Sequence, residues 1–388
     1  FNMLAGSIFF LNPNTTYEVK LDLFDPDGGS GSQISTVTTR SVPSLPSGGR
    51  TLHVAPGAGG GDGTLGNPFR GIVAAQTAAV PSDIFLLHAG NYGSAVTFNK
   101  PGTPGNYIVW KAAADGEDII NAITNLSASP TWFEEINFVG DGVWNVVGRN
   151  ASNDVVFILN RVTNCENCFI LDDAGGTNWY IADNTIIGNV SVNNLSYPGE
   201  GIELTHSTGY TAGHIVAYNR ITGVGDGLSV SSGGSSTCQD SASNIDIYGN
   251  DIFDVRDDGL ELDGGCANIR VWGNRIHNAV NHAISFQPQN NAPWYFIRNQ
   301  IVNNKLNILK LQSLQTHYSF IHNSFVSWGN SAEKAVQYSY GHGLFEGFSR
   351  NNIWVTALDT NYIWETSDAR SWKTDIDYDG FDWGNDTT

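Results

Sequence analysis

The stretches DIYGN (246–250), RVWGN (270–274), WYFIRN (294–299) and YSFIHN (318–323) establish the architecture, because each is a short β-patterned run that ends in asparagine. Asparagine follows such runs along most of the chain, at Asn137, Asn160, Asn184, Asn219, Asn250, Asn274, Asn299, Asn323 and Asn352. The successive gaps of 23 to 35 residues are the period of stacked β-rich units and predict a parallel β-helix. Asparagine suits an inner corner, since its amide tolerates left-handed backbone and can pair with the asparagine one coil above. The alternative is a β-sandwich with asparagine at its turns, which does not explain the constant phase.

The composition is typical of an acidic extracellular β protein. The 388 residues carry 19 Lys and Arg against 38 Asp and Glu, a formal net charge of −19. Such a surface disfavours nucleic acid and anionic membranes as partners, although acidic patches can hold divalent cations. No run of 18 apolar residues is present, so the sequence predicts no membrane span. We expect a secreted or cell-surface protein that is monomeric.

The four cysteines favour an oxidising compartment. Cys238 and Cys266 each follow a strand that contains DGL, on coils that should be neighbours. Stacked coils lie about 4.8 Å apart, within the ~4.4–6.8 Å that a disulfide spans between Cα atoms, so we predict a Cys238–Cys266 bridge. Cys165 and Cys168 form a C-x-x-C pair with no second pair beside it. This favours a local bridge or two buried thiols over a redox or zinc site.

Residues 1–45 do not carry the repeat. The run LNPNTTYEVKLDLFDPDGG, with Leu11, Pro13, Thr15 and Tyr17, resembles the last strands of a fibronectin type III domain and its tyrosine corner. Only about three strands of that domain fit. We therefore expect a partial fibronectin type III-like segment that ends in a linker.

The β-helix should occupy residues 46–388. Its glycine-rich run at 57–63 lacks a strict G-x-G-x-x-G before a helix, so we interpret it as a surface loop and not as a nucleotide site. The Ala-rich segment at 71–79 predicts a helix that caps the open end of the solenoid. The pattern V-x-P-x-x-G, G-T, N-P-F, A, D and L-x-x-G-x-Y, in this order within TLHVAPGAGGGDGTLGNPFRGIVAAQTAAVPSDIFLLHAGNY (51–92), resembles the start of many secreted right-handed β-helix enzymes, including pectate lyases. After Asn352 the repeat weakens, and we expect an irregular tail over about 356–388.

Five strand segments fall in register when the coils are aligned on their asparagines. They are GEGIEL (199–204), GDGLSV (225–230), RDDGLEL (256–262), NHAISF (281–286) and LNILKL (306–311). Alternate apolar residues should point into the core, namely Leu228, Leu260, Ile284 and Leu309. The residues between them should form one exposed strip, with Glu200, Asp226, Asp257, Asp258, His282 and Lys310, and beside it Glu203, Glu261 and Asp263.

Stacked carboxylates about 5 Å apart repel one another and cannot all stay ionised without a partner. Either one of them has a raised pKa and serves as an acid, or a cation lies among them. The structural alternative is that Asp-Gly turns end the strands and that Asp caps backbone N–H groups. That alternative needs one Asp per coil. It does not need a doubled Asp followed by Glu, His and Lys on the same face.

The order of Asp226, the Asp257–Asp258 pair, His282 and Lys310 resembles that of polygalacturonase-type glycoside hydrolases, which carry NTD, DD, GHG and RIK motifs. The resemblance implies that Asp258 or Asp257 is the general acid, that Asp226 helps to activate water, and that Lys310 holds a substrate carboxylate or hydroxyl. It implies inverting hydrolysis, with the acid and the base about 6.5–9.5 Å apart. In this chain NTD is VGD, GHG is NHA, and the Arg of RIK is an Ile.

The run Asp257-Asp258-Gly-Leu-Glu261, with Asp226 one coil earlier, also resembles the calcium site of family-nine pectate lyases. This second resemblance implies a Ca²⁺ ion held by Asp226, Asp257, Asp258 and Glu261. It also implies a catalytic base at Lys310, whose segment is comparable with GFKLGG. The metal would neutralise a uronate carboxylate and acidify the C5 proton that neutral Lys310 removes.

The spacing differs from that of family-nine pectate lyases, because an additional coil with His282 separates the Asp pair from Lys310. It would place Lys310 about 10 Å from the metal, or give the role of base to His282. Residues expected to contact substrate are Glu203, Asp263, Arg298 and Trp294.

We predict an all-β chain, a right-handed parallel β-helix with an N-terminal capping helix, that acts on polysaccharide. The leading function is calcium-assisted β-elimination on a glycan that contains uronic acid. The second is inverting hydrolysis by the carboxylates of Asp226, Asp257 and Asp258. The third is a non-catalytic glycan-binding or adhesin shaft, which predicts that the strip holds backbone caps and no metal.

Overall fold

The computed structural model describes all residues except 1–5, 95, 122–123, 150–151, 172–175, 195, 197–198, 205–210, 231–241, 287–292, 303–306, 313–314, 328–333, 340–343, 346, 357–361, 365–373 and 383–388. It divides into two compact units, Phe1–Leu45 and Pro46–Thr388, which are described one at a time. Among the described residues, no helix has the length and apolar character needed to cross a membrane.

The first unit is an antiparallel hairpin of β1 (Thr16–Leu23) and β2 (Gly31–Thr38). Most side chains of both strands are exposed, so the pairing relies mainly on the backbone ladder. The backbone N–H of Asn12 donates to the Tyr17 hydroxyl at 2.9 Å, a contact of the kind that a tyrosine corner makes. The relationship to fibronectin type III stays a prediction.

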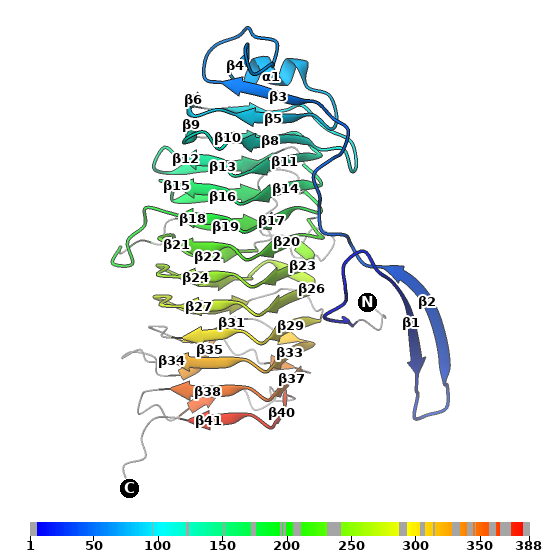
Figure 1. Ribbon diagram of the computed structural model, residues 1–388. Helices are drawn as coiled ribbons and strands as arrows, with labels where there is room; N and C mark the ends of the chain where they lie inside the picture. Colours follow the sequence, from blue (N-terminus) through cyan, green and yellow to red (C-terminus); the bar gives the residue numbers. More distant parts are fainter. Residues whose placement is uncertain are drawn as a thin grey trace. The chain divides into compact units, whose positions relative to one another are not determined.

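The second unit is a parallel β-solenoid of three long sheets, whose strands stack one above another between α1 and β41 (Figure 1). In spatial order, the 14-stranded sheet contains β4 (Phe69–Arg70), β3 (Thr51–Ala55), β5 (Ile84–Leu87), β8 (Ile108–Ala112), β11 (Thr131–Glu134), β14 (Val155–Ile158), β17 (Tyr180–Ala182), β20 (Ile215–Ala217), β23 (Ala242–Tyr248), β26 (Gly265–Trp272), β29 (Trp294–Ile297), β33 (Tyr318–Ile321), β37 (Gly347–Arg350) and β40 (Thr374–Asp377). The 12-stranded sheet contains β6 (Gly90–Ser94), β9 (Asp118–Asn121), β12 (Asn137–Val139), β15 (Arg161–Thr163), β18 (Thr185–Ile187), β21 (Arg220–Thr222), β24 (Asp251–Phe253), β27 (Arg275–His277), β30 (Gln300–Val302), β34 (Ser324–Ser327), β38 (Ile353–Thr356) and β41 (Gly380–Asp382). The 11-stranded sheet contains β7 (Thr97–Phe98), β10 (Thr124–Leu126), β13 (Trp144–Gly148), β16 (Asn167–Leu171), β19 (Glu200–Leu204), β22 (Asp226–Ser229), β25 (Leu260–Glu261), β28 (Ile284–Phe286), β31 (Leu309–Gln312), β35 (Lys334–Ser339) and β39 (Tyr362–Trp364). A further pair joins β32 (Gln315–Thr316) to β36 (Leu344–Phe345).

Helix α1 (Ile72–Ala78) lies at the first coils, where the Ala-rich segment 71–79 predicts a capping helix. Apolar residues of its inner face belong to the solenoid core. The buried Gln76 ties the helix to the coil beneath it. Its side-chain amide donates to the carbonyl of Thr97 at 2.8 Å and accepts from the backbone N–H of Asn99 at 2.9 Å.

The asparagine ladder runs along the corner between the 14-stranded and the 12-stranded sheets. Its buried members are Asn160, Asn184, Asn219, Asn250, Asn274, Asn299, Asn323 and Asn352. Asn250 shows the pattern: its Oδ1 accepts from the backbone N–H of Asn219 at 2.9 Å, and its Nδ2 donates to Oδ1 of Asn274 at 2.9 Å. The same Nδ2 donates to the carbonyl of Val216 at 2.9 Å. Each amide is therefore satisfied by its neighbours, which allows a polar column to lie inside the protein.

Both ends of the ladder differ from the sequence prediction. Asn137 is not a member, because Ile136 occupies the ladder position and donates its backbone N–H to Oδ1 of Asn160 at 3.0 Å. At the other end Asp379 takes the place of asparagine and accepts from the backbone N–H of the last member at 2.8 Å. The prediction of an irregular tail over 356–388 is also wrong in part, since β40 and β41 continue the two sheets by another coil.

The cysteines divide into a described pair and a partly described one. Cys165 and Cys168 form a disulfide with their Cα atoms 5.0 Å apart, the local bridge that the C-x-x-C spacing allows. Cys266 is buried and disulfide-bonded. Cys238 lies outside the described residues, so the predicted Cys238–Cys266 pairing stays a prediction.

Candidate active site

The predicted strip lies on the neighbouring strands β19, β22, β25, β28 and β31 of the 11-stranded sheet. The prediction that it is exposed is wrong for Asp226, Asp258 and His282, which are buried at the corner where these strands start. The predicted inward residues are fully buried in each case: Leu228, Leu260, Ile284 and Leu309. Parallel pairing in register then forms two rows of polar residues. The corner row, at the start of the strands, contains Glu200, Asp226, Asp258 and His282. The strand row, further along the strands, contains Glu203, Ser229, Glu261, Ser285 and Lys310.

The corner row is held together by the carboxylates themselves. Asp226 Oδ1 accepts from the backbone N–H of Asp258 at 2.7 Å, and Asp258 Oδ1 accepts from the backbone N–H of His282 at 3.1 Å. The corner row thus includes the backbone caps that the structural alternative predicts. It also holds contacts between side chains, which that alternative does not require.

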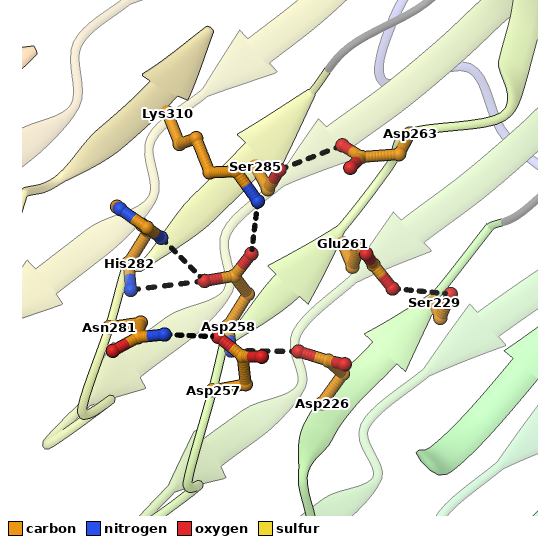
Figure 2. A network of polar contacts seen from close by, with 10 residues as sticks. All are labelled: Asp226, Ser229, Asp257, Asp258, Glu261, Asp263, Asn281, His282, Ser285 and Lys310. Carbon is orange, nitrogen blue, oxygen red and sulfur yellow. Dashed lines mark hydrogen bonds and ion pairs between the residues drawn. The ribbon is translucent and has the colours of Figure 1, made fainter. Parts of the chain in front are cut away.

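The Asp258 carboxylate joins a histidine and a lysine from two later coils (Figure 2). Its Oδ1 lies 2.7 Å from His282 Nδ1, and its Oδ2 lies 3.6 Å from Lys310 Nζ. Because a carboxylate oxygen accepts, the Nδ1 of a neutral His282 carries the proton and its Nε2 carries the basic lone pair. Asp258 is only 1% exposed, whereas the side chain of Lys310 is 29% exposed. Of the three groups, Lys310 therefore has the best access to a substrate.

The additional coil does not separate Lys310 from the Asp pair by the predicted distance, because the long lysine side chain reaches back over Ser285. Burial by itself lowers the pKa of the Lys310 ammonium, but the carboxylates of Asp258, Asp263 and Glu261 outweigh that effect and raise it. Lys310 is therefore a cation near neutral pH in this arrangement. That state is suited to binding a negative charge, and it disagrees with the neutral base that the resemblance implies.

Three carboxylates form a second feature, the carboxylate trio of Glu200, Asp226 and Glu261. Each offers an oxygen, and the three oxygens lie within 4.8 Å of one another. Burial raises the pKa of Glu200 and of Asp226 well above the ordinary range, and the neighbouring charges of Asp226 and Glu261 add to it. Burial, then the charge of Asp263, raises the pKa of Glu261 to about 7. The trio is thus partly protonated near neutral pH unless a cation joins it.

The residues of the trio suit a divalent cation. Glu200 Oε2 is buried and makes no hydrogen bond to any of the described residues, which is a costly state for a carboxylate oxygen. Calcium takes six to eight oxygen ligands, and three carboxylates can supply about half of them or more. The trio differs from the predicted set of Asp226, Asp257, Asp258 and Glu261, since it includes Glu200 and neither member of the Asp pair.

Asp257 and Asp258 are grouped with His282 in a separate cluster, also within 4.8 Å. The Asp257 carboxylate accepts from Nδ2 of Asn281 at 2.6 Å, one coil further on. Burial, then the charge of Asp258, raises the pKa of Asp257. Sequence reasoning did not identify Asn281, although it precedes His282 as Asp257 precedes Asp258.

The strand row contains the other predicted contacts. Glu203 is half-buried beside Ser229 on the next strand, at the start of the row. Asp263 follows β25 and accepts from Ser285 Oγ at 2.7 Å, and Ser229 Oγ donates to Glu261 at 3.3 Å. The two serines were missed because no motif marks them. Their signal is positional, since each lies opposite a charged residue in the alignment of coils.

Two predicted substrate contacts are elsewhere. Trp294 is 1% exposed and packs in the solenoid core, because it starts β29 at an inward position of the 14-stranded sheet between Ile269 and Tyr318. The prediction that it contacts substrate is wrong. Arg298 is exposed in the turn between β29 and β30, beside the asparagine ladder. That corner lies between the other two sheets, so Arg298 is not part of the two rows.

Comparisons with known proteins agree with this architecture. Residues 234–325 match a family described as right handed beta helix region. The A-module of the Azotobacter vinelandii mannuronan C-5 epimerase AlgE6 is similar at 14% identity and a TM-score of 0.54, over 80% of this chain and 93% of that one. A rhamnogalacturonan lyase is similar at 15% identity and a TM-score of 0.52, over 85% and 87%. The pectate lyase Pel9A is similar at 14% identity and a TM-score of 0.47, over 88% and 82%.

None of the curated proteins matches the sequence. At these identities the solved structures establish the fold, which is a right-handed parallel β-helix.

Proposed function

We propose that this chain is a polysaccharide lyase that cleaves a uronic-acid-containing glycan by β-elimination at the two polar rows. The observation that carries the proposal is the Asp258 carboxylate, which joins His282 and Lys310 directly beside the carboxylate trio. A glycan substrate is further supported by the two neighbours with TM-scores above 0.5, which are named for mannuronan and rhamnogalacturonan.

In this proposal His282 is the base. Asp258 positions the imidazole through Nδ1, so that Nε2 takes the proton from C5 of the uronate. The electron pair of the C5–H bond forms the C4=C5 double bond as the C4–O bond breaks, and water protonates the leaving oxygen. Lys310 binds the substrate carboxylate and stabilises the negative charge that grows on it as the proton leaves.

Glu200, Asp226 and Glu261 would hold a calcium ion. When bound, it supplies a second positive charge that favours binding of an acidic polymer to a chain with a net charge of −19. A bound cation would also explain why these three carboxylates lie so close together, because it removes the repulsion that raises their pKa values.

The test is incubation with a panel of uronic-acid polymers, measuring the ultraviolet absorbance of the unsaturated product that only elimination makes. If Lys310 were the base instead, kcat would keep rising into strongly alkaline pH, because the carboxylates of Asp258, Asp263 and Glu261 raise the pKa of its ammonium. His282→Ala should abolish the product. If the unsaturated product never forms with any polymer, the proposal is wrong.

Hydrolysis is the second candidate because the Glu261 carboxyl has a pKa of about 7, which suits a general acid at neutral pH. The acid that the polygalacturonase resemblance implies at Asp258 is less suited, since that carboxylate is 1% exposed. Reducing ends that appear without ultraviolet absorbance would favour hydrolysis. If no polymer yields either product, and neither calcium nor EDTA changes the melting temperature, the non-catalytic shaft would be favoured.

We also propose that the protein is extracellular. The Cys165–Cys168 disulfide supports an oxidising compartment.

A further inference from the structure

A cavity lies at the N-terminal end of the described solenoid, beside α1. Its volume is about 890 Å³, within the ~300–1,000 Å³ of ordinary small-molecule sites. Its walls come from the glycine-rich loop, β4, α1, β6 and the segment around β7. On the 11-stranded sheet, β10, β13 and β16 separate β7 from the first strand of the polar rows. The cavity is therefore distinct from the proposed active site.

The charge of this cavity is opposite to that of the chain. Arg70 and Lys100 both line it, and none of its described lining residues is acidic. In the described part of the chain neither cation has an ion-pair partner, although acidic residues outnumber basic ones 38 to 19. Two unpaired cations that converge on one hollow of so acidic a protein indicate an anionic ligand.

The glycine-rich loop, which the sequence alone suggests is only a surface loop, holds Arg70 in place. The backbone of Arg70 accepts from the N–H of Gly59 at 2.7 Å and donates to the carbonyl of Gly60 at 3.0 Å. Both glycines have positive φ angles, of 82° and 88°, which other residues rarely adopt. A Cβ added at Gly57 would lie 3.1 Å from the Cβ of Arg70. The loop therefore fixes the position from which the guanidinium extends.

The other walls are also fixed. Gln76 bonds to the backbone of Thr97 and Asn99, as described above, and so joins the helix wall to the wall that leads to Lys100. The Tyr92 hydroxyl lies 2.7 Å from the carbonyl of Val54 and 2.8 Å from that of His88. Its polar end is thus bound to the backbone and its ring is left to form the wall. The cavity requires little reorganisation to accept a ligand.

We propose that this cavity is an accessory binding site for an acidic sugar residue. Arg70 and Lys100 would bind its carboxylate by charge-assisted hydrogen bonds. The Tyr92 ring and the exposed Val73 offer apolar contact to the face of a sugar ring, and Asn99 and Thr77 offer polar groups to its hydroxyls. This site goes beyond the proposed function, because it retains an acidic glycan at the first coils and does not cleave it.

Titration calorimetry with trigalacturonate tests the proposal. The protein carries Lys310→Ala and the buffer contains EDTA, so that neither turnover nor a calcium site contributes. Adding Arg70→Ala and Lys100→Ala should weaken binding about 100-fold, roughly tenfold for each lost charged contact. The matched control is Arg161→Ala with Arg275→Ala, which removes the same charge from exposed positions of β15 and β27 and should change Kd less than about twofold. Neutral galactotriose should bind at least about tenfold more weakly than trigalacturonate.

The proposal is overturned if trigalacturonate does not bind, if the cavity double variant binds it as well as the control does, or if galactotriose binds equally. The outcome is separable from that of the lyase proposal. In the Lys310 background, binding that depends on Arg70 and Lys100 supports the cavity whether or not the wild-type chain makes unsaturated product. In the wild-type background, the cavity double variant should keep its turnover of a short dissolved substrate within about twofold.

Discussion

The solenoid has two columns of stacked polar residues that differ in how their members satisfy one another: the asparagine ladder at one corner, and the carboxylate trio, which spans the corner row and the strand row of the 11-stranded sheet. In the asparagine ladder each amide both donates and accepts, so every member from Asn160 to Asn352 is paired with the next. In the carboxylate trio the members can only accept when ionised, and Glu200 Oε2 has no hydrogen-bond partner within the part of the chain that the structure describes. Both columns have the spacing of parallel strands.

The difference shows what a repeat can and cannot satisfy by itself. A column of neutral groups that both donate and accept can be extended without limit, because each new coil supplies the hydrogen-bond partner that the previous coil lacks. A column of like charges becomes less favourable with each member, until protons or a cation compensate. Stability is therefore expected from the first column, and ligand binding from the second.

The largest effect should come from the groups beside the trio. Lys310→Ala should lower kcat by about 10²–10⁴-fold on a cleaved uronic-acid polymer, because the substrate carboxylate loses its counter-charge. The melting temperature should change little, since the lysine side chain is partly exposed. Ultraviolet absorbance assays and thermal unfolding measure the two quantities. Retained turnover would exclude the proposed role of Lys310.

The ladder should show the opposite behaviour. Asn250→Ala removes the acceptor of the Asn219 backbone N–H and the donor to the carbonyl of Val216, and it leaves Oδ1 of Asn274 with only the backbone N–H of residue 250. The free energy of unfolding should fall by about 2–4 kcal/mol, with kcat unchanged in the protein that stays folded. The exposed Asn193→Ala is the control and should cost less than about 0.5 kcal/mol in urea unfolding. Equal costs for the two variants would mean that the ladder does not stabilise the fold.

The pH dependence of stability also distinguishes the two columns, because the carboxylate trio contains titratable groups and the asparagine ladder does not. The pKa of Glu261 is raised from 4.5 to about 7, so between these values the native state binds more protons than the unfolded chain. In EDTA the free energy of unfolding should therefore decrease as pH rises through this window, by up to about 3 kcal/mol for this group. Glu261→Gln should remove this group's contribution to the slope, whereas Asp118, Glu200 and Asp226, whose pKa values are also raised, keep theirs.

Calcium should also remove the slope, and should raise the melting temperature at pH 8, because a bound cation favours the ionised carboxylates. Glu200→Gln should weaken this effect by about tenfold in the calcium concentration needed. Thermal unfolding at several calcium concentrations measures it. An unchanged calcium response in Glu200→Gln would show that the trio is not the site.

The smallest effect is expected on the exposed side of the corner that contains the asparagine ladder. Arg298 lies there with a φ angle of 54°, so Arg298→Asn keeps the backbone conformation and removes the charge. We expect kcat/KM to change by less than about twofold, and the free energy of unfolding by less than about 0.5 kcal/mol. A large loss of kcat/KM would mean that substrate extends around this corner.

The coil repeat, the capping helix and the inward residues could be predicted from the sequence, because they depend on periodicity. Prediction from the sequence fails where an error of one residue in register changes which side chain occupies a position. Asn137 is adjacent to the ladder position and not in it, and only the register of β12 reveals that Ile136 is there. Trp294 likewise begins a strand at an inward position, which the aromatic residue alone does not indicate.

The composition of the polar rows was predictable, but their internal contacts were not. Glu200, Asp226, Asp258, His282 and Lys310 all lie on the predicted face. Which carboxylate meets which partner depends on side-chain length and rotamer, as for the lysine that reaches back to Asp258 across a coil. The strand pattern carries no information of that kind.

Because every asparagine makes the same bonds as the next, a whole coil such as the 24 residues from Asn250 to Gly273 can be duplicated or deleted during evolution without leaving an amide unpaired. The polar rows do not tolerate such a change silently, since each coil brings a different side chain to them. Gene-level gain or loss of one unit would therefore keep the scaffold intact and reassort its chemistry. A lineage could in this way acquire a coil like the one that carries His282 in a single event.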